Sequence, residues 1–276
     1  MTHTLTIAAT ALLTWLSMHG YRGKAAFEQQ PAMAGPDCGS ATCHSGLEQC
    51  WIGKLCVARQ VPMEGGFSID ATEVTRFQYE SWLATHPSTS AQNAKCAWNS
   101  SFAAEPRCMS HWDVCQTGCA NHPQVCVDWC DAQAYCKAVG KRLCGRMGGG
   151  SDASGAKADP IRGQWYNACV SGRNRNAYPY GDTYDEQACN GIAQHVNTTV
   201  EVGTLSECQS SISGYDGVFD LSGNVSEWVD ACSANDACRM DGGAFNGAKD
   251  ELGCGGDRRA LRRSAEPALG FRCCSQ

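Results

Sequence analysis

The chain has 276 residues, of which 20 are cysteine, and its net charge is −6. This length suits one large domain, with or without a small module, and is enough to bury a core. An acidic chain without clustered Lys and Arg is a poor partner for nucleic acid, whose phosphates attract basic side chains. No apolar run reaches the ~20 residues of a membrane-spanning helix, so we expect no spanning segment.

The cysteines indicate disulfides rather than zinc. Zinc sites usually contain closely spaced pairs such as C-x-x-C, and the sequence has no such pair. The even count and the wide scatter favour a disulfide framework. Because disulfides persist in oxidising compartments, we expect an extracytoplasmic protein, either periplasmic or secreted.

Residues 1–30 are interpreted as a signal-like apolar leader and a linker. The apolar stretch 5–18 has the length of the hydrophobic region of a signal peptide. Its flanks disagree, because no Lys or Arg precedes it while Arg22 and Lys24 follow it, and this arrangement favours a cytoplasmic body. We give the cysteines more weight than the flanks, so export stays the expectation.

Residues 31–60 are predicted to form a small Cys-rich module. Four cysteines fall within 19 residues of it, namely Cys38, Cys43, Cys50 and Cys56. A segment this short cannot bury a core. Two local disulfides would hold it together, and three pairings are possible. The main domain is then expected at 61–276.

The first half of the main domain begins with a strand and a helix. The alternation over 67–70 predicts a short strand. Thr72 is the expected N-cap of a helix over 73–84.

Two further helices are predicted. Asp128, with Asp131 three residues later, indicates the start of a helix that ends at Gly140. A short third helix should contain Trp165 and Cys169. After residue 170 the chain is rich in Gly, Asn and Asp, which favours turns and short strands.

Six short blocks follow one another along the main domain. They include Phe-Ser-Ile-Asp-Ala-Thr-Glu-Val-Thr at 67–75 and Gly-Val-Phe-Asp-Leu-Ser-Gly-Asn-Val-Ser-Glu-Trp at 217–228, and the others lie at 123–143, 178–181, 242–245 and 270–273. In this order they resemble the formylglycine-generating enzyme (sulfatase-modifying factor) domain. The resemblance covers 61–276. It implies a disulfide-rich α+β fold related to C-type lectins, with little regular secondary structure.

The family includes copper oxidases that convert a sulfatase cysteine to formylglycine, and domains joined to non-haem-iron enzymes. Soft thiolates select Cu(I). The oxidases carry two such thiols in the pattern Gly-Gly-Ser-Tyr-x-Cys-x-x-x-x-Cys, which begins with a double glycine. In this sequence Gly247 and Leu252 stand at the two cysteine positions. The resemblance therefore implies a divergent member without the copper pair, so we expect no copper and assign no catalytic residue.

The resemblance also implies two disulfides by position. Cys136 corresponds to the partner of Cys273, and Cys169 corresponds to the partner of Cys254. The sequence does not assign pairings to the other twelve cysteines of the main domain.

A calcium site is the one metal site that we expect. Asp220 and Glu227 are carboxylates seven residues apart, and Gly223 and Val225 between them can present backbone carbonyls. This pattern resembles a calcium site of the family. The alternative is an acidic turn over a buried Trp228.

The function favoured at this stage is a non-catalytic binding or structural role with bound calcium. A groove at Gly242, Gly243, Ala244, Phe245, Asn246 and Gly247 would hold an extended peptide, an exported protein or a small ligand. One alternative is an oxidoreductase that acts on a protein cysteine, or a non-haem-iron relative. Another is calcium-dependent glycan binding, by analogy of fold.

Overall fold

The computed structural model describes residues 35–111, 115, 117–152 and 159–276. The expected leader at 1–30 lies outside these residues. The helices are α1 (Arg76–Leu83), α2 (Pro106–His111), α3 (Trp129–Ala138) and α4 (Gln164–Cys169). The strands are β1 (Asp37–Cys38), β2 (Ala41–Thr42), β3 (Glu48–Trp51), β4 (Leu55–Ala58), β5 (Gln60–Met63), β6 (Phe67–Asp70), β7 (Arg142–Leu143), β8 (Ser226–Cys232), β9 (Ala237–Asp241), β10 (Arg258–Leu261), β11 (Leu269–Phe271) and β12 (Cys273–Ser275).

Two four-stranded sheets form the centre of the described chain. Their strand orders are β10-β9-β8-β11 and β5-β6-β12-β7. Strand β11 runs parallel to β8, whereas β9 pairs with β8 in the antiparallel sense. Short strands and long turns together give the mixed architecture with few helices that the sequence predicted.

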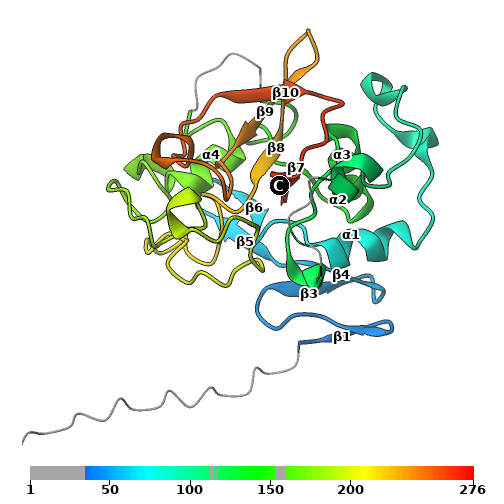
Figure 1. Ribbon diagram of the computed structural model, residues 1–276, viewed down its shortest axis with the longest axis horizontal. Coiled ribbons are helices and arrows are strands. Elements are labelled where there is room, and N and C mark those ends of the chain that lie inside the picture. Colours follow the sequence, from blue (N-terminus) through cyan, green and yellow to red (C-terminus); the bar gives the residue numbers. More distant parts are fainter. Residues whose placement is uncertain (1–34, 112–114, 116, 153–158) are drawn as a thin grey trace, which may run out of the picture. The chain divides into compact units, whose positions relative to one another are not determined.

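Strand β8 separates two hydrophobic cores. Successive side chains of a strand point to opposite faces, so Trp228 packs with α3 in one core and Val229 packs with α4 in the other. Figure 1 shows α3 and α4 on opposite sides of β8.

The adjacent cysteines of β12 follow the same alternation. Cys273 is joined to Cys136 on α3, and Cys274 is joined to Cys144 just after β7. The two neighbouring residues therefore link the last strand covalently both to α3 and to the chain that follows β7. Cross-links over separations of 137 and 130 residues restrict the unfolded chain strongly.

The segment 37–58 consists of two hairpins, β1-β2 and β3-β4. Its disulfides are interleaved, Cys38–Cys50 and Cys43–Cys56, which is one of the three possible pairings. The segment packs on the larger part of the chain, because Val57 is buried in the core that contains α3. The indole of Trp51 lies against Gly140, where a Cβ would collide with it.

The predicted start of the first helix was wrong by three residues. The N-cap of α1 is Thr75, whose side chain accepts a hydrogen bond from Gln78 N while the Gln78 side chain accepts one from Thr75 N. Thr72 instead lies in a bend before the helix, where Val74 N donates to Phe271 O and Val74 O accepts from Gln124 N. Tertiary pairing therefore delays the helix.

The second predicted helix begins where the sequence indicated, and the third contains the residues expected in it. Asp128 caps α3 with hydrogen bonds from Cys130 N and Asp131 N, and the Asp131 side chain accepts from Asp128 N. Helix α4 contains Trp165 and Cys169, both buried. None of the helices in the described ranges is long and apolar enough to cross a membrane.

Candidate functional site

The double glycine after β9 makes a buried turn that only glycine can form. Gly243 has φ of 67°, in the left-handed region, and a Cβ there would collide with Glu251 O. Gly247 N closes the turn on Ala244 O at 2.7 Å. Of the six residues expected to form a groove, only Asn246 is exposed. A ligand at this place would meet Asn246 and the exposed residues 248–250 rather than the glycines.

Gly247 and Leu252 lie next to each other across this turn. A Cβ built on Gly247 is 3.3 Å from Leu252 Cδ2, and Leu252 is 1% exposed. The leucine also fills the space beside Gly243 and Gly191. The structure thus brings together the two positions that carry thiols in the copper oxidases. The isobutyl side chain of Leu252 fills the space beside Gly247.

No cysteine is free to replace the missing pair. All 20 cysteines fall within the described ranges, and each of them is in a disulfide. Cys254, which is two residues beyond Leu252, is joined to Cys169, and Cys136 is joined to Cys273. The residues present therefore do not fit a two-thiolate Cu(I) site.

The loop from Asp220 to Glu227 wraps closely around this turn. Gly223 has φ of 76°, and a Cβ there would collide with the backbone of Asn190. Gly223 N donates to Gly242 O at 2.9 Å, and Phe245 N donates to Asn224 O at 3.0 Å. The expected calcium loop and the expected groove are therefore one packed unit.

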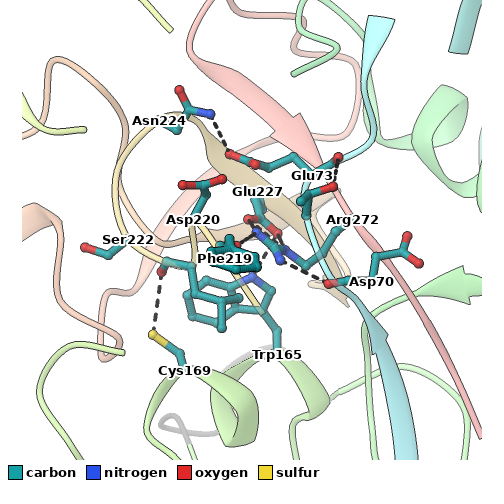
Figure 2. A network of polar contacts seen from close by, with 12 residues as sticks. Asp70, Glu73, Trp165, Cys169, Phe219, Asp220, Ser222, Asn224, Glu227 and Arg272 are labelled. Carbon is teal, nitrogen blue, oxygen red and sulfur yellow. Dashed lines mark hydrogen bonds and ion pairs between the residues drawn. The ribbon is translucent and has the colours of Figure 1, made fainter. Parts of the chain in front are cut away.

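Glu227 makes a buried ion pair instead of facing solvent. Arg272 Nη2 lies 2.7 Å from Glu227 Oε1, and Arg272 Nε lies 2.7 Å from Glu227 Oε2. Trp165 Nε1 donates to Glu227 Oε2 at 2.9 Å. Both charged side chains are 0% exposed, and Figure 2 shows them at the centre of the polar network. Burial lowers the pKa of Arg272, but the charge of Glu227 outweighs it and raises that pKa above its usual value.

Two more carboxyl groups lie beside this pair. Asp220 Oδ2 accepts from Gly203 N at 2.7 Å, and Glu73 Oε1 accepts from Asn224 Nδ2 at 3.1 Å (Figure 2). Burial raises the pKa of Asp220 to about 6, and burial with the neighbouring Asp220 raises the pKa of Glu73 well above its usual range. Asp220 Oδ1 and Glu73 Oε2 are buried and accept no hydrogen bond from another group, but a proton retained by Glu73 lets the two carboxyl groups bond each other.

The contacts of Asp220 and Glu227 determine which of their oxygens are available to a calcium ion. Asp220 Oδ1 is a suitable ligand when Glu73 is ionised, because the oxygen then lacks the partner that buried polar atoms normally have. Glu227 would have to share its carboxylate with the guanidinium of Arg272. Within the described ranges, no three Asp, Glu or His ligand atoms lie close enough together to hold a metal ion. Calcium at Asp220, Gly223, Val225 and Glu227 therefore stays a prediction.

Sequence reasoning missed three residues of this centre. Glu73 falls inside the helix expected over 73–84, but it precedes α1 and is buried. Arg272 and Trp165 were assigned only to blocks of resemblance or to a helix, yet both bind Glu227. The one available signal is that Glu73, Glu227 and Arg272 stand within the blocks 67–75, 217–228 and 270–273 that carry the resemblance.

The family model of the sulfatase-modifying factor enzyme 1-like domain matches residues 30–276. The chain belongs to this family. The match begins well before residue 61, so it includes the two N-terminal hairpins. The mixed, disulfide-rich fold agrees with the assignment.

Two curated relatives are similar over part of their length. The serine/threonine-protein kinase pkn1 of Chlamydia caviae is 25% identical over 179 residues, which are 58% of this chain and 25% of the kinase. The formylglycine-generating enzyme of Streptomyces coelicolor is 34% identical over 120 residues, which are 41% of this chain and 33% of that enzyme. The chain thus matches a third or less of the length of either relative.

Among solved structures, PvdO from Pseudomonas aeruginosa has a similar fold. The TM-score is 0.51 at 19% identity, and the superposition covers 80% of this chain and 82% of PvdO. At this level of identity the similarity concerns the fold alone.

Proposed function

We propose that this chain is a non-catalytic binding domain of the sulfatase-modifying factor family. The observation that carries the proposal is the contact between Gly247 and Leu252. A two-coordinate Cu(I) site needs a sulfur at each of these positions, and neither residue has one. With every cysteine in a disulfide, the chain has no thiolate that could replace them.

The disulfides support a location outside the cytoplasm. Ten cross-links in one chain of this size would be reduced in a cytosol. The proposal is therefore that the domain is exported and works in the periplasm or beyond the cell.

An extended peptide of an exported protein is the proposed partner. Ile192 and Val196 are 49% and 41% exposed, and Ile192 N donates to Gly247 O at 3.0 Å. An apolar surface thus borders the turn, next to the exposed Asn246. Rigid scaffolds commonly present such loop residues to a partner.

Calcium is proposed as a structural ion of the same loop. Asp220 Oδ1 supports it, because a cation would satisfy this buried oxygen. The ion would fix the loop that carries the double-glycine turn.

An aldehyde assay tests the non-catalytic role. The purified protein, loaded with Cu(I), is incubated with a cysteine-containing sulfatase peptide, and the formylglycine-generating enzyme of Streptomyces coelicolor serves as the positive control. We expect no aldehyde above the level of the peptide alone. Turnover by this chain would refute the proposal.

Selection from a displayed peptide library tests the binding role. We expect enriched peptides to lose binding to Ile192→Asp. The matched control is Ile161→Asp, because Ile161 is also exposed, at 65%, but does not border the turn. Equal loss in both variants, or no enrichment at all, would argue against this surface.

A further inference from the structure

A hollow of about 540 Å³ lies on the outer side of α3, away from the turn and loop described above. The end of α1, the segment 87–93 and the start of β7 complete its walls. No residue of 220–227 or 242–247 lines it. Its volume is within the ~300–1,000 Å³ of typical small-molecule sites.

The floor of the hollow is apolar because of how α3 is oriented. The residues that face the core are Ala132, Tyr135, Cys136 and Val139, so the positions between them face outward. Two of the residues between them are alanines: Ala134 is half-buried at the edge of that core, and Ala138 is exposed. Their small side chains leave the space that larger residues would fill.

Two aromatic rings form the opposite wall. Trp82 and Phe102 line the hollow with ring centroids 5.2 Å apart. Both are largely buried, at 3% and 5% exposed. The small exposed part of each ring gives the hollow a rigid apolar edge against which a ligand can pack.

The rim of the hollow has an excess of positive charge. Lys137, Lys141, Arg142 and the single carboxylate Asp230 line it. Asp70 pairs with Lys141 at 2.5 Å, so that charge is already neutralised. Within the described chain, Lys137 donates to Ala91 O, and Arg142 donates to three backbone oxygens and to the side-chain oxygen of Gln276. Neither side chain forms an ion pair with a carboxylate there.

The guanidinium of Arg142 is incompletely satisfied. Its Nη atoms donate to Leu143 O, Gly150 O, Arg146 O and the side-chain oxygen of Gln276, whereas its Nε has no partner. Burial lowers the pKa of Arg142, although nearby Asp230 opposes this effect. An anion bound beside it would remove part of this cost.

We propose that this hollow binds a small carboxylate with an apolar body. The carboxylate lies between Lys137 and Arg142, and the apolar body packs on Trp82, Phe102 and the alanines of α3. A free aryl or alkyl acid and the apolar C-terminal residue of a peptide share this chemistry. The inference does not depend on the proposed function, because the two sites share no residue.

The experiment uses 4-phenylbutyrate, 4-phenylbutanamide and 4-phenylbutylamine as probes of one shape and three charges. Binding to the ¹⁵N-labelled protein is followed by chemical-shift changes. We expect the acid to bind about tenfold more tightly than the amide, with the amine weakest, because the rim is cationic. The shifts should cluster at Trp82, Phe102 and Ala134.

Variants locate the site and test its charge. Ala134→Leu should fill the hollow and abolish binding of the acid, and Ala138→Leu, at an exposed position, repeats the test if the first variant is unstable. Lys137→Gln and Arg142→Gln should each weaken the acid several-fold and leave the amide unchanged. Lys54→Gln, an exposed change of equal charge on the β3-β4 turn, should leave both unchanged.

The result that overturns the proposal is equal binding of the acid, amide and amine, no binding at millimolar probe, or binding that survives both leucine variants. N-acetyl-Ala-Phe distinguishes the two sources of the carboxylate. Tighter binding than 4-phenylbutyrate assigns the site to peptide chain ends, and weaker binding assigns it to free acids.

Discussion

Glu227 and Arg272 form a bidentate ion pair whose two side chains are both 0% exposed, although 45 residues separate them in the chain. Strands β8 and β11 run parallel here, and Arg272 follows directly after β11. The guanidinium also donates to Phe219 O at 2.8 Å and to Asp70 O at 3.1 Å. One side chain thus connects both sheets to the loop 220–227, which positions the double-glycine turn.

Loss of this arginine should be costly. Arg272→Met leaves Glu227 buried without its cation, and removal of one partner of a buried pair costs about 3–5 kcal/mol. Urea unfolding with the disulfides intact measures the change. Arg259→Met is the control, because its pair with the exposed Asp257 should contribute less than ~1 kcal/mol. Similar changes in both variants would contradict the central role of Arg272.

Calcium should raise the melting temperature of the protein. An ion that binds only the folded chain adds about 2.7 kcal/mol at one hundred times its dissociation constant. Asp220→Ala should remove this response, because its unpartnered oxygen is the expected ligand. Scanning calorimetry with calcium, magnesium or chelator measures it. A melting temperature that is the same in all three would refute the calcium site.

The start of α3 should make stability depend on pH. Burial and the charge of Asp128 raise the pKa of Asp131 to about 8, and burial raises that of Asp128 to about 6. Above pH ~4 the unfolded chain releases these protons while the native chain retains them. Stability should therefore fall as the pH rises from 4 to 8.

Asp131→Asn tests the origin of this dependence. The amide has no proton to release, so the slope between pH 4 and 8 should flatten, while the exposed substitution Glu186→Gln should leave it unchanged. Unfolding free energies at several pH values give the slope. A steeper fall in Asp131→Asn than in the parent protein would contradict the assignment.

The long disulfides should contribute more than the short ones. Replacing both Cys136 and Cys273 by Ala opens a loop with a separation of 137 residues, which costs about 5 kcal/mol in the chain-entropy model. The same change at Cys232 and Cys238, separated by 6 residues, costs about 2 kcal/mol. Thermal unfolding of the two variants gives the comparison. Equal destabilisation would show that strain or packing, rather than loop length, dominates.

The parts of the fold that could be predicted from the sequence are those set by local signals, such as the capping residues of helices. The start of α3 follows from Asp128 and Asp131, which bond each other's backbone within one turn. The capping pair Thr75 and Gln78 is equally local, but Thr72 offers a similar N-cap signal. The tertiary bonds of Val74, which delay the helix to Thr75, leave no mark in the sequence.

Long-range partners could not be predicted in the same way. Asp70 Oδ2 accepts from Cys273 N, 203 residues away, and no spacing rule connects such positions. The interleaved disulfides of 37–58 likewise depend on how the two hairpins stack. The adjacency of Gly247 and Leu252 was accessible only through the resemblance, which supplied the spacing of the missing thiols.

The loss of the copper site is tested most directly by a Cu(I) titration with a competing chelator. The titration compares the protein with its double variant Gly247→Cys/Leu252→Cys. The two positions are in contact, so the variant should gain one tight site per chain, whereas the parent protein should hold none. Stoichiometric, tight Cu(I) in the parent protein would contradict the central claim that the redox site has been lost.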